Sequence, residues 1–482
     1  MTARDLLALL PLICLAYGAV AVMVVGAFWR SHAGIAGLTL ASLAAALLVS
    51  GQAFALAPRQ VTPLLRVDVF ALSYLVLFVL GAAALTAFSW DYLAGIPQGR
   101  ERFYCLLLLA VAGMGVLAAS THFASFFLGL ETLSVSLYGL IGFTLRRPAS
   151  LEGSLKYLVL AGVSLSFLLL GMALVYFQFG TMEFAALAER LGRSGDPPYL
   201  VLLGLGLILV GFGFKLALVP FHTWAPDVYQ GAPAPVSALV ATGSKAALLA
   251  VLVRFAPVLM GAHSGAPLLE VLAIITMFGG NLLALFQGNL KRLLAYSSIA
   301  HMGYLLIPLL AGGAAGVASI WFYFVSYFIT TIGAFGVISA LSAGPEEVAE
   351  LEQYRGLGFR RPWIGAVLGL MMLSLAGIPL TVGFMAKLYI FAAAARSGLW
   401  LLLVVGVVNS GMAAYYYLRV LSILYSQPGE AEERLPRVRP ASGVVLVALS
   451  VLVVLLGIVP GALMSRAQAI SRGTASTTDG HR

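Results

Sequence analysis

The segment GFGFKLALVPFHTWAPDVY, residues 211–229, places one lysine in the middle of a long apolar run. No Asp, Glu, Lys or Arg occurs between Pro197 and Phe214, and the next formal charge after Lys215 is Asp227. A lysine near the centre of a bilayer is unfavourable by about 3 kcal/mol or more, and such residues commonly mark ion pathways. This stretch therefore predicts a membrane-spanning fold with a polar functional centre.

The overall composition also indicates a membrane protein. Of the 482 residues, 61% are hydrophobic and 10% are charged, whereas soluble domains are about 25% charged. The net charge of +9 comes from basic residues scattered at the ends of apolar runs, so it indicates membrane topology rather than a nucleic-acid partner. Cys14 and Cys105 each stand alone, so we expect no iron–sulfur, haem or zinc site, and no cofactor, in this chain.

Apolar runs long enough to cross a bilayer occur about fourteen times, which predicts an all-α polytopic membrane protein. We expect these spans near residues 6–28, 34–57, 67–90, 103–119, 121–143, 152–179, 199–218, 236–256, 266–287, 295–311, 314–341, 362–390, 397–425 and 443–464. The first run has no small-residue cleavage site before Arg30, so we interpret it as an uncleaved span. The longest polar segments, 343–361, 426–442 and the tail after 465, are too short to fold alone.

The basic residues give an orientation. With this count, the odd-numbered loops contain thirteen positive charges, at Arg30, Arg100, Arg102, Arg146, Arg147, Lys291, Arg292, Arg355, Arg360, Arg361, Arg434, Arg437 and Arg439. The even-numbered internal loops contain six, at Arg59, Arg66, Arg190, Arg193, Arg254 and Arg396. The positive-inside rule then puts the odd loops in the cytoplasm and both termini outside.

Several other polar residues lie within predicted spans. Glu131, in THFASFFLGLETLSVSLYGL, is flanked on both sides by more than ten uncharged residues, and Lys245 and Lys387 are similarly isolated. His301 is within helical reach of Ser297 and Ser298. Lys156 is close to Glu152 and a span end, where it can snorkel to the interface, and Arg419 follows Tyr415, Tyr416 and Tyr417 near another end.

Each of these residues has a structural alternative. A membrane lysine can join two helices through an ion pair, and this reading stays open for Lys156 and Arg419. His301 can be a hydrogen-bonded packing residue. For Glu131, Lys215, Lys245 and Lys387 we favour function, because adhesion between helices is achieved at lower cost by small residues and hydroxyls.

One glutamate with several buried lysines suits proton movement. A lysine in a dry cavity favours its neutral form, and a nearby carboxylate restores the charged form. If Glu131 moves toward and away from Lys215, that lysine alternately holds and loses its proton. Lys245, His301 and Lys387 then pass the proton on through waters, and a histidine suits a middle position because it titrates near neutrality.

The segment GFGFK at 211–215 is echoed by GFMAK at 383–387. Pro220 follows the first lysine, and Gly377 and Pro379 precede the second, so both spans are expected to be interrupted where the backbone lines a polar cavity. The spacing corresponds to five spans, an odd number that inverts topology. Paired interrupted spans in two halves indicate an inverted-repeat transporter, and we interpret the echo as a duplicated ion-handling unit.

Four segments carry a resemblance to a known family: PFHTWAPDVYQGAPAPVSALVATGSKAALLA (220–250), YSSIAHMGY (296–304), YRGLGFRRP (354–362) and LAGIPLTVGFMAKLYIF (375–391). With them the chain resembles the antiporter-like membrane subunits of bacterial proton-translocating NADH:quinone oxidoreductase, respiratory complex I, and among these subunit N. The resemblance covers most of the chain and is weakest in the first hundred residues and the tail. Leu380, where the family often has proline, and Gln230, where glutamate is frequent, depart from the pattern.

The resemblance implies fourteen helices with two inverted five-helix repeats, spans 4–8 and 9–13, and interrupted helices at spans 7 and 12. It divides a single integral domain over 1–482 into an N-terminal three-helix segment (1–102), two repeats (103–256 and 266–425) and a last helix (443–464). By position, Glu131 and Lys215 correspond to the family's glutamate–lysine pair. Lys245 corresponds to its central lysine and Lys387 to its terminal lysine. Lys156 and His301 fall on further polar positions of the path.

The resemblance also implies partners. NADH, FMN, iron–sulfur clusters and quinone belong to partner subunits, and antiporter-like subunit M and small subunit K are the expected neighbours in the bacterial inner membrane. Alternatives are a D-type subunit of an Mrp sodium/proton antiporter, and the equivalent subunit of a related dehydrogenase with another electron donor. A purely structural scaffold is a third alternative, and it predicts that Lys215 and Lys387 tolerate alanine.

Overall fold

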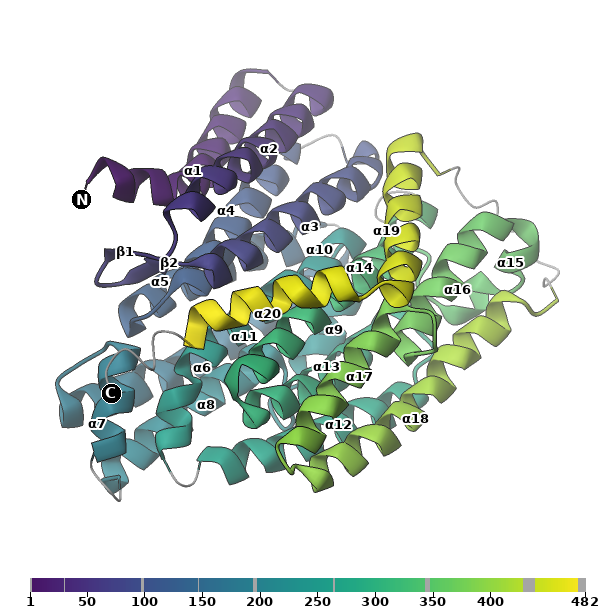
Figure 1. The fold of residues 1–482 in the computed structure, drawn as a ribbon. Coiled ribbons are helices and arrows are strands. Elements are labelled where there is room, and N and C mark those ends of the chain that lie inside the picture. Colours follow the sequence, from purple (N-terminus) through teal and green to yellow (C-terminus); the bar gives the residue numbers. More distant parts are fainter. Residues whose placement is uncertain are drawn as a thin grey trace.

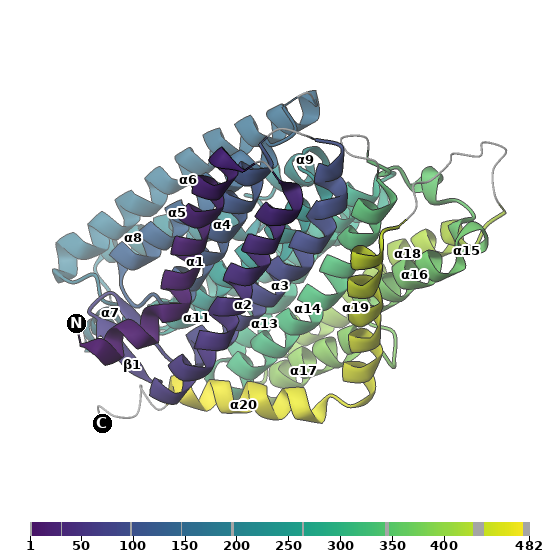
Figure 2. The ribbon, with the colours of Figure 1, turned by 90° about the horizontal axis from the view of Figure 1, so that it is seen from above.

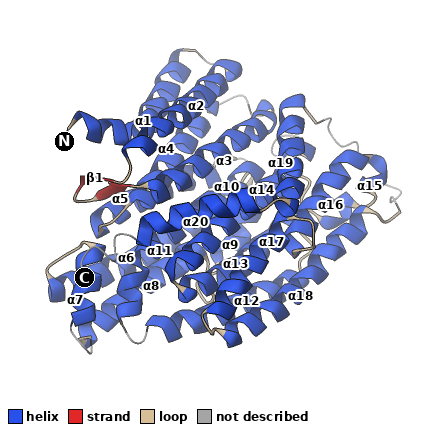
Figure 3. Cartoon of the chain, viewed as in Figure 1, coloured by secondary structure: helices blue, strands red, loops and turns tan. Residues whose placement is uncertain are grey.

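The computed structural model describes residues 2–29, 31–96, 99–145, 147–193, 197–262, 265–342, 347–427 and 438–475. Arg30, Arg146, Arg434 and Arg437, which contribute to the predicted orientation, lie outside these residues. Apart from one small hairpin, the described elements are helical (Figure 3).

The first half of the chain forms α1 (Ala3–Phe28), α2 (His32–Leu56), β1 (Arg59–Thr62), β2 (Leu65–Val67), α3 (Val69–Ala94), α4 (Arg100–Ala119), α5 (Phe123–Ile141), α6 (Pro148–Phe179), α7 (Phe184–Arg193), α8 (Tyr199–Leu216), α9 (Trp224–Gly231), α10 (Ala234–Leu239), the π-helix η1 (Val240–Ser244) and α11 (Lys245–Gly261). The second half forms α12 (Gly265–Leu285), α13 (Leu290–Ala311), α14 (Gly313–Leu341), the 3₁₀-helix η2 (Leu351–Tyr354), α15 (Leu357–Arg360), α16 (Pro362–Ala376), α17 (Val382–Arg396), α18 (Trp400–Leu424), α19 (Pro440–Ile458) and α20 (Gly461–Ala475).

Thirteen helices of the described chain are long and apolar enough to cross a membrane, with α10, η1 and α11 counted together as one. The pair α16 and α17 supplies a fourteenth span, because each half is too short to cross alone. Spans one to six are α1 to α6, span seven is α8 with α9, and span eight is α10–η1–α11. Spans nine to fourteen are α12, α13, α14, α16 with α17, α18 and α19. The predicted multi-pass, all-α membrane fold is confirmed.

The spans are arranged around a buried centre (Figures 1 and 2). The most apolar stretch of span eight is entirely buried inside the protein, and those of spans eleven and ten are 94% and 89% buried. By contrast, the corresponding stretch of α19 is 17% buried. Helices that are hydrophobic all round can occupy either position in a membrane protein, so tertiary packing decides which spans are central.

Both predicted interruptions are present. Helix α8 ends at Leu216, where Ala217 adopts a left-handed conformation (φ 57°), and α9 begins at Trp224. Helix α16 ends at Ala376, where Gly377 is left-handed (φ 82°), and α17 begins at Val382. In the second break Leu380 also has a positive φ of 73° and is exposed, so the break is complete without the second proline.

The two five-span repeats appear in the packing. Spans four and five pack together as spans nine and ten do, and span four meets span eight as span nine meets span thirteen. Isolated bridges join His122 to Glu183 and Asn289 to Glu350. His122 and Asn289 are 167 residues apart, as are Glu183 and Glu350, and His122 and Asn289 are the N-caps of equivalent helices, α5 and α13.

The proposed equivalence of GFGFK and GFMAK is wrong. Lys215 lies in the last turn of α8, before the break in span seven, whereas Lys387 lies in α17, after the break in span twelve. The two backbone breaks correspond when Ala217 is matched with Gly377, because each ends its helix in the left-handed conformation. Lys215 then matches Leu375. The repeat is present, but the two lysines are not its symmetry mates.

Several elements outside the predicted spans were not predicted from the sequence, among them a hairpin and a last helix. Strands β1 and β2 form an antiparallel hairpin between α2 and α3. The last predicted span, 443–464, ends at Ile458, and a further helix, α20, begins at Gly461 after Pro460. Ala467 and Ile470 of α20 are buried, and the helix packs against α14 and α3. In Figure 2 it runs along the edge of the bundle where the hairpin and the start of α1 also lie.

Candidate functional site

Lys215 is 6% exposed and projects from the last turn of α8 toward α5. Its ammonium donates a hydrogen bond of 2.7 Å to Ser134 Oγ. The ring of Tyr157, from α6, lies 5.2 Å from the ammonium. The lysine therefore occupies an aromatic cage with one hydroxyl partner, in which the π-face offsets part of the cost of burying a cation.

Glu131 lies one helical turn before Ser134 on α5 and is half-buried. Its neighbours on the same face, Leu128 and Val135, are each 57% exposed, so the carboxylate lies at the outer surface of this chain. Among the described residues Glu131 forms no ion pair, so the structure does not bring it into contact with Lys215. The hydroxyl of Ser134 accepts from the lysine and donates to the carbonyl of Leu130 in its own helix at 2.7 Å.

Lys245 is fully buried at the start of α11, directly after the π-helix η1. Its ammonium donates to Ser298 Oγ at 2.6 Å, and Ser298 also shares a hydrogen bond of 3.2 Å with the hydroxyl of Tyr229. A π-turn widens the helix locally, and such turns are frequent at functional sites. Here the turn precedes the residue that carries the charge.

His301, from α13, is held between two tyrosine hydroxyls. Nδ1 lies 2.5 Å from the hydroxyl of Tyr323, and Nε2 lies 3.2 Å from that of Tyr417. Tyr417 in turn contacts Ser297. Because a neutral imidazole has one donor and one acceptor, one tyrosine donates to the ring and the other accepts from it. This arrangement connects hydroxyl groups of three helices through the histidine.

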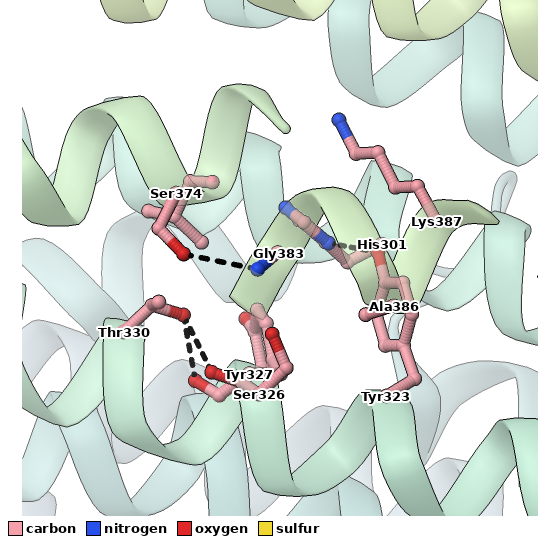
Figure 4. Close-up of a pocket in the computed structure, with 10 residues that line it drawn as sticks. His301, Tyr323, Ser326, Tyr327, Thr330, Ser374, Gly383, Ala386 and Lys387 are labelled. Atoms are coloured by element: carbon pink, nitrogen blue, oxygen red, sulfur yellow. Dashed lines mark hydrogen bonds between the residues drawn. The ribbon is translucent and has the colours of Figure 1, made fainter. Parts of the chain in front are cut away.

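Lys387 lies in α17 beside the break in span twelve. Its ammonium donates to the carbonyl of Ala376 at 2.8 Å and to Ser410 Oγ at 3.1 Å. It lines a small cavity together with His301. Figure 4 shows the ammonium directed away from the histidine, toward the backbone at the break. The cavity offers about 10 Å³ to the centre of a water molecule, close to the space that one water requires.

Lys156 has a different environment from the other lysines. Its side chain is 42% exposed, and the ammonium pairs with Glu152 at 2.6 Å and with Asp227 at 2.7 Å. Asp227 also pairs with Arg292 at 2.7 Å, which extends the ion network from α6 to α13. This is the ion-pair environment that the structural alternative expects, and the network contacts neither Lys215 nor Lys245.

Arg419 and Arg254 perform equivalent structural tasks in the two repeats. Arg419 of α18 donates to the carbonyls of Leu285 and Gln287 at the end of α12. Arg254 of α11 donates to the carbonyl of Ala118 at the end of α4, at 2.9 Å. Each arginine of the last span of a repeat thus satisfies free carbonyls at the end of the first span. The structural alternative for Arg419 agrees with these contacts.

The buried ion pair between Lys291 and Glu347 is not predicted from the sequence, in which Lys291 is expected in a loop. Lys291 lies in the first turn of α13 and pairs with Glu347 at 2.5 Å, and both side chains are fully buried. Arg147 also reaches Glu347, at 3.2 Å. The segment that carries Glu347 contains several carboxylates, and nothing in its local pattern marks this one as buried.

Apart from Arg419, which donates to backbone carbonyls, the interior cations described above fall into two classes. Lys291 and Arg254 are paired with carboxylates, as buried charges normally are. Lys215, Lys245 and Lys387 have no carboxylate partner among the described residues, and each donates to one serine hydroxyl. The described residues contain no group of three His, Cys, Asp or Glu placed to hold a metal ion.

Comparison with known families gives one match. The family model described as NADH:quinone oxidoreductase/Mrp antiporter, TM matches residues 120–413. This range includes both interrupted spans, seven and twelve, and every buried lysine of the site described above.

Three solved structures that are similar to this chain come from different membrane complexes. A chain of respiratory complex I from Thermus thermophilus, with bound aureothin, is 38% identical, with 94% of this chain and 98% of that chain covered and a TM-score of 0.81. A chain of the membrane-bound sulfane sulfur reductase, an archaeal respiratory membrane complex, is 26% identical, with coverages of 98% and 99% and a TM-score of 0.84. A chain of the Mrp complex from Dietzia sp. is 22% identical, with coverages of 98% and 97% and a TM-score of 0.85, which shows the fold alone.

Proposed function

Because the chain belongs to the NADH:quinone oxidoreductase/Mrp antiporter transmembrane family, we propose that it is a proton-translocating subunit, of the N type, in the membrane arm of a bacterial NADH:quinone oxidoreductase. In this role it moves protons through buried side chains while partner subunits carry out the electron transfer. The enzyme activity is that of the assembled translocase. NADH, FMN, iron–sulfur clusters and quinone are assigned to the partners, and no cofactor is assigned to this chain.

The observation that carries the proposal is the kind of group that each buried lysine contacts. Lys215, Lys245 and Lys387 are at most 6% exposed and rely on serine hydroxyls rather than carboxylates. A hydroxyl offsets only part of the cost of removing an ammonium from water. A lysine held in this way is suited to giving up and regaining its proton, whereas a helix-joining lysine is better served by a partner such as Glu347.

The proposed sequence of events begins at Glu131, on the surface of this chain that a neighbouring subunit can contact. Glu131 receives an electrostatic or conformational change from a neighbouring subunit, which its half-buried position on the surface of α5 allows. A shift of its charge changes the proton affinity of Lys215, whose hydrogen-bond partner Ser134 lies one helical turn after Glu131 on α5. This first switch needs no redox group in the chain.

The relay continues through the centre of the bundle. Lys245 donates to Ser298 of α13. His301 contacts Tyr417, which in turn contacts the adjacent serine, Ser297. Lys387 then releases the proton outward beside the break in span twelve. Waters bridge the gaps between these groups, and the cavity shared by His301 and Lys387 has room for about one. We assign Lys156 to the entry side, where its ion pairs face the surface.

We choose complex I over the alternatives because of the sequence identities to the solved structures. The complex I chain is 38% identical, compared with 26% for the sulfane sulfur reductase chain and 22% for the Mrp chain. We assign the antiporter-like subunit M and the small subunit K as neighbours, and the bacterial inner membrane as location, with both termini outside. The D-type Mrp subunit and a related complex with another electron donor remain the competing assignments.

Purification from the native host tests the assignment. A tagged copy of the chain is extracted in mild detergent, and the eluate is assayed for inhibitor-sensitive NADH:quinone reductase activity against an untagged control. We expect activity well above the control. A multisubunit assembly without this activity contradicts the complex I assignment and favours an Mrp-type antiporter or a complex with another donor.

A further inference from the structure

The carboxylate of Glu347 lies where four loops of the bundle meet. Oε1 accepts a hydrogen bond of 2.7 Å from the backbone N–H of Ala234, at the start of span eight. Oε2 accepts from Lys291, at the start of span ten, at 2.5 Å, and from Arg147, just before span six, at 3.2 Å. Lys291 also donates to the carbonyl of Ala232 at 2.5 Å. One side chain therefore joins the ends of spans six, eight, ten and eleven.

The centre of this cluster is the Lys291–Glu347 pair, which is buried and has a counterpart in neither position of the first repeat. The side chains of Glu347 and Lys291 are fully buried, and that of Arg147 is 27% exposed. At the spacing of 167 residues that relates the repeats, the counterparts of Lys291 and Glu347 are Ala124 and Gly180. The fold of a repeat therefore forms without the pair, so its presence in the second repeat calls for a separate explanation.

Two of the spans that Glu347 joins, eight and ten, carry the contact between Lys245 and Ser298 at the centre of the proposed proton path. Ser298 lies two turns after Lys291 on α13, about 10 Å along the axis, and Lys245 lies about 16 Å beyond Ala234 on span eight. The π-helix η1 separates Ala234 from Lys245. Because a π-turn interrupts the regular hydrogen bonding of a helix, the position of Lys245 relative to Ser298 depends on how the end of span eight is anchored.

We propose that Glu347 is a positioning residue of the proton path, which through Lys291 and the backbone of Ala234 holds Lys245 within hydrogen-bond distance of Ser298. The inference rests on the proposed function, since it assigns a task to Glu347 in the same relay. Glu347 itself carries no proton along the path, because its two oxygens are occupied by three donors, of which Arg147 alone is partly exposed.

The test separates positioning from stability. Loss of Glu347 alone leaves Lys291 buried without a partner, which lowers assembly whatever the role of the carboxylate. In the double variant Glu347→Met/Lys291→Met, the pair is replaced by apolar side chains of similar size, which is often neutral for folding. Assembled complex is quantified for the wild type, this double variant and the control Glu352→Gln, whose exposed carboxylate pairs with Arg355 in the same segment.

Proton translocation in vesicles is measured per assembled complex, together with the KM for quinone. We expect the double variant to assemble but to lose turnover by about threefold or more, because a displacement of about 1 Å at the reacting groups is enough to slow transfer. The KM stays unchanged, since the quinone site lies in partner subunits, and Glu352→Gln behaves as the wild type. Wild-type turnover in the double variant overturns the proposal.

Two further variants keep the test decisive. If the double variant does not assemble, Glu347→Asp takes its place, because it keeps the charge but shortens the reach to Ala234 and Lys291. Reduced turnover per complex with unchanged KM supports positioning, and full turnover overturns it. The variant Lys215→Ala reports on the proposed function separately. If Lys215→Ala pumps normally, the proposed function fails; if it loses pumping while the Glu347 variants keep it, only the positioning role fails.

Discussion

At the scale of single residues, the partner of a buried ammonium separates the two classes of lysine. Lys215, Lys245 and Lys387 meet serine hydroxyls, whereas Lys291 meets a carboxylate. A hydroxyl can accept the hydrogen bond of an ammonium and also donate to a neutral amine, so it serves both protonation states. A carboxylate stabilises only the charged state. The serines are therefore part of the proposed function as much as the lysines are.

The serine beside Lys215 gives the first prediction. In Ser134→Ala the ammonium of Lys215 loses its one hydrogen-bond partner among the described residues. Proton translocation is expected to fall by about tenfold, which corresponds to one hydrogen bond to a charged group. The matched control is Ser136→Ala in the same helix, because the hydroxyl of Ser136 donates to the backbone carbonyl of Thr132 and not to a lysine. Translocation is measured in vesicles for both variants. Equal translocation rates in the two variants would show that the hydrogen bond between Ser134 and Lys215 does not contribute to proton translocation.

A second prediction compares two ion pairs of different burial. Glu347→Gln leaves the fully buried Lys291 without a countercharge and should destabilise the protein by about 3–5 kcal/mol. Lys156→Met breaks pairs that are partly exposed, and Asp227 keeps Arg292 as a partner, so the loss should be about 1 kcal/mol or less. Thermal unfolding of the purified complexes measures the difference. A larger loss for Lys156→Met would contradict the burial of the Glu347 cluster.

The sequence predicts the buried lysines better than their surroundings. Lys215 and Lys245 stand out because their apolar neighbours leave no other charge nearby. Glu347 does not stand out, because Glu350 and Glu352 lie in the same polar segment and only tertiary contacts decide which carboxylate is buried. The predicted contact of Glu131 with Lys215 likewise depends on side-chain placement, and in the structure the ammonium of Lys215 contacts Ser134 instead.

At the scale of elements, the two interrupted helices show what a sequence motif can and cannot establish. Proline and glycine predicted the interruptions in spans seven and twelve, because both residues end helices for local steric reasons. The echo of GFGFK in GFMAK suggested that the lysines are equivalent, but they lie on opposite sides of their breaks. Three identical residues out of five carry no information on which half-helix they occupy, whereas the bridges at His122 and Asn289 relate the repeats directly.

Gly377 provides a third prediction, at the break in span twelve. A Cβ on this residue would lie 2.9 Å from Cδ and 3.3 Å from Nζ of Lys387, and its φ of +82° is left-handed. Gly377→Ala should therefore displace the lysine and lower translocation. Gly398→Ala is the matched control, because it has a similar φ of +72° but no atom within 4 Å of the added carbon. Both variants carry a strain of about 1–2 kcal/mol.

The readout for this pair is proton translocation per assembled complex. Backbone strain alone affects both variants alike, so a loss confined to Gly377→Ala reports on the position of Lys387. If Gly398→Ala loses as much activity as Gly377→Ala, strain and not the lysine accounts for the effect.

At the scale of the whole molecule, hydrophobic patterning predicts the number of spans but not their arrangement. All spans are apolar, so the sequence does not distinguish the central spans eight, ten and eleven from the peripheral α19. The structure puts Lys245 and His301 on those central spans. Helix α20 is not predicted because its mixed composition resembles a polar tail. Only its packing against α14 and α3 shows which of its residues are buried.

The central claim is that the unpaired buried lysines move protons for the assembled complex. Its most direct test purifies the complex with Lys215→Ala, reconstitutes it in vesicles, and measures proton translocation and coupled quinone reduction together. We predict that both rates fall well below those of the wild type while the amount of assembled complex stays comparable. Full translocation and full quinone reduction in the Lys215→Ala complex would contradict the account.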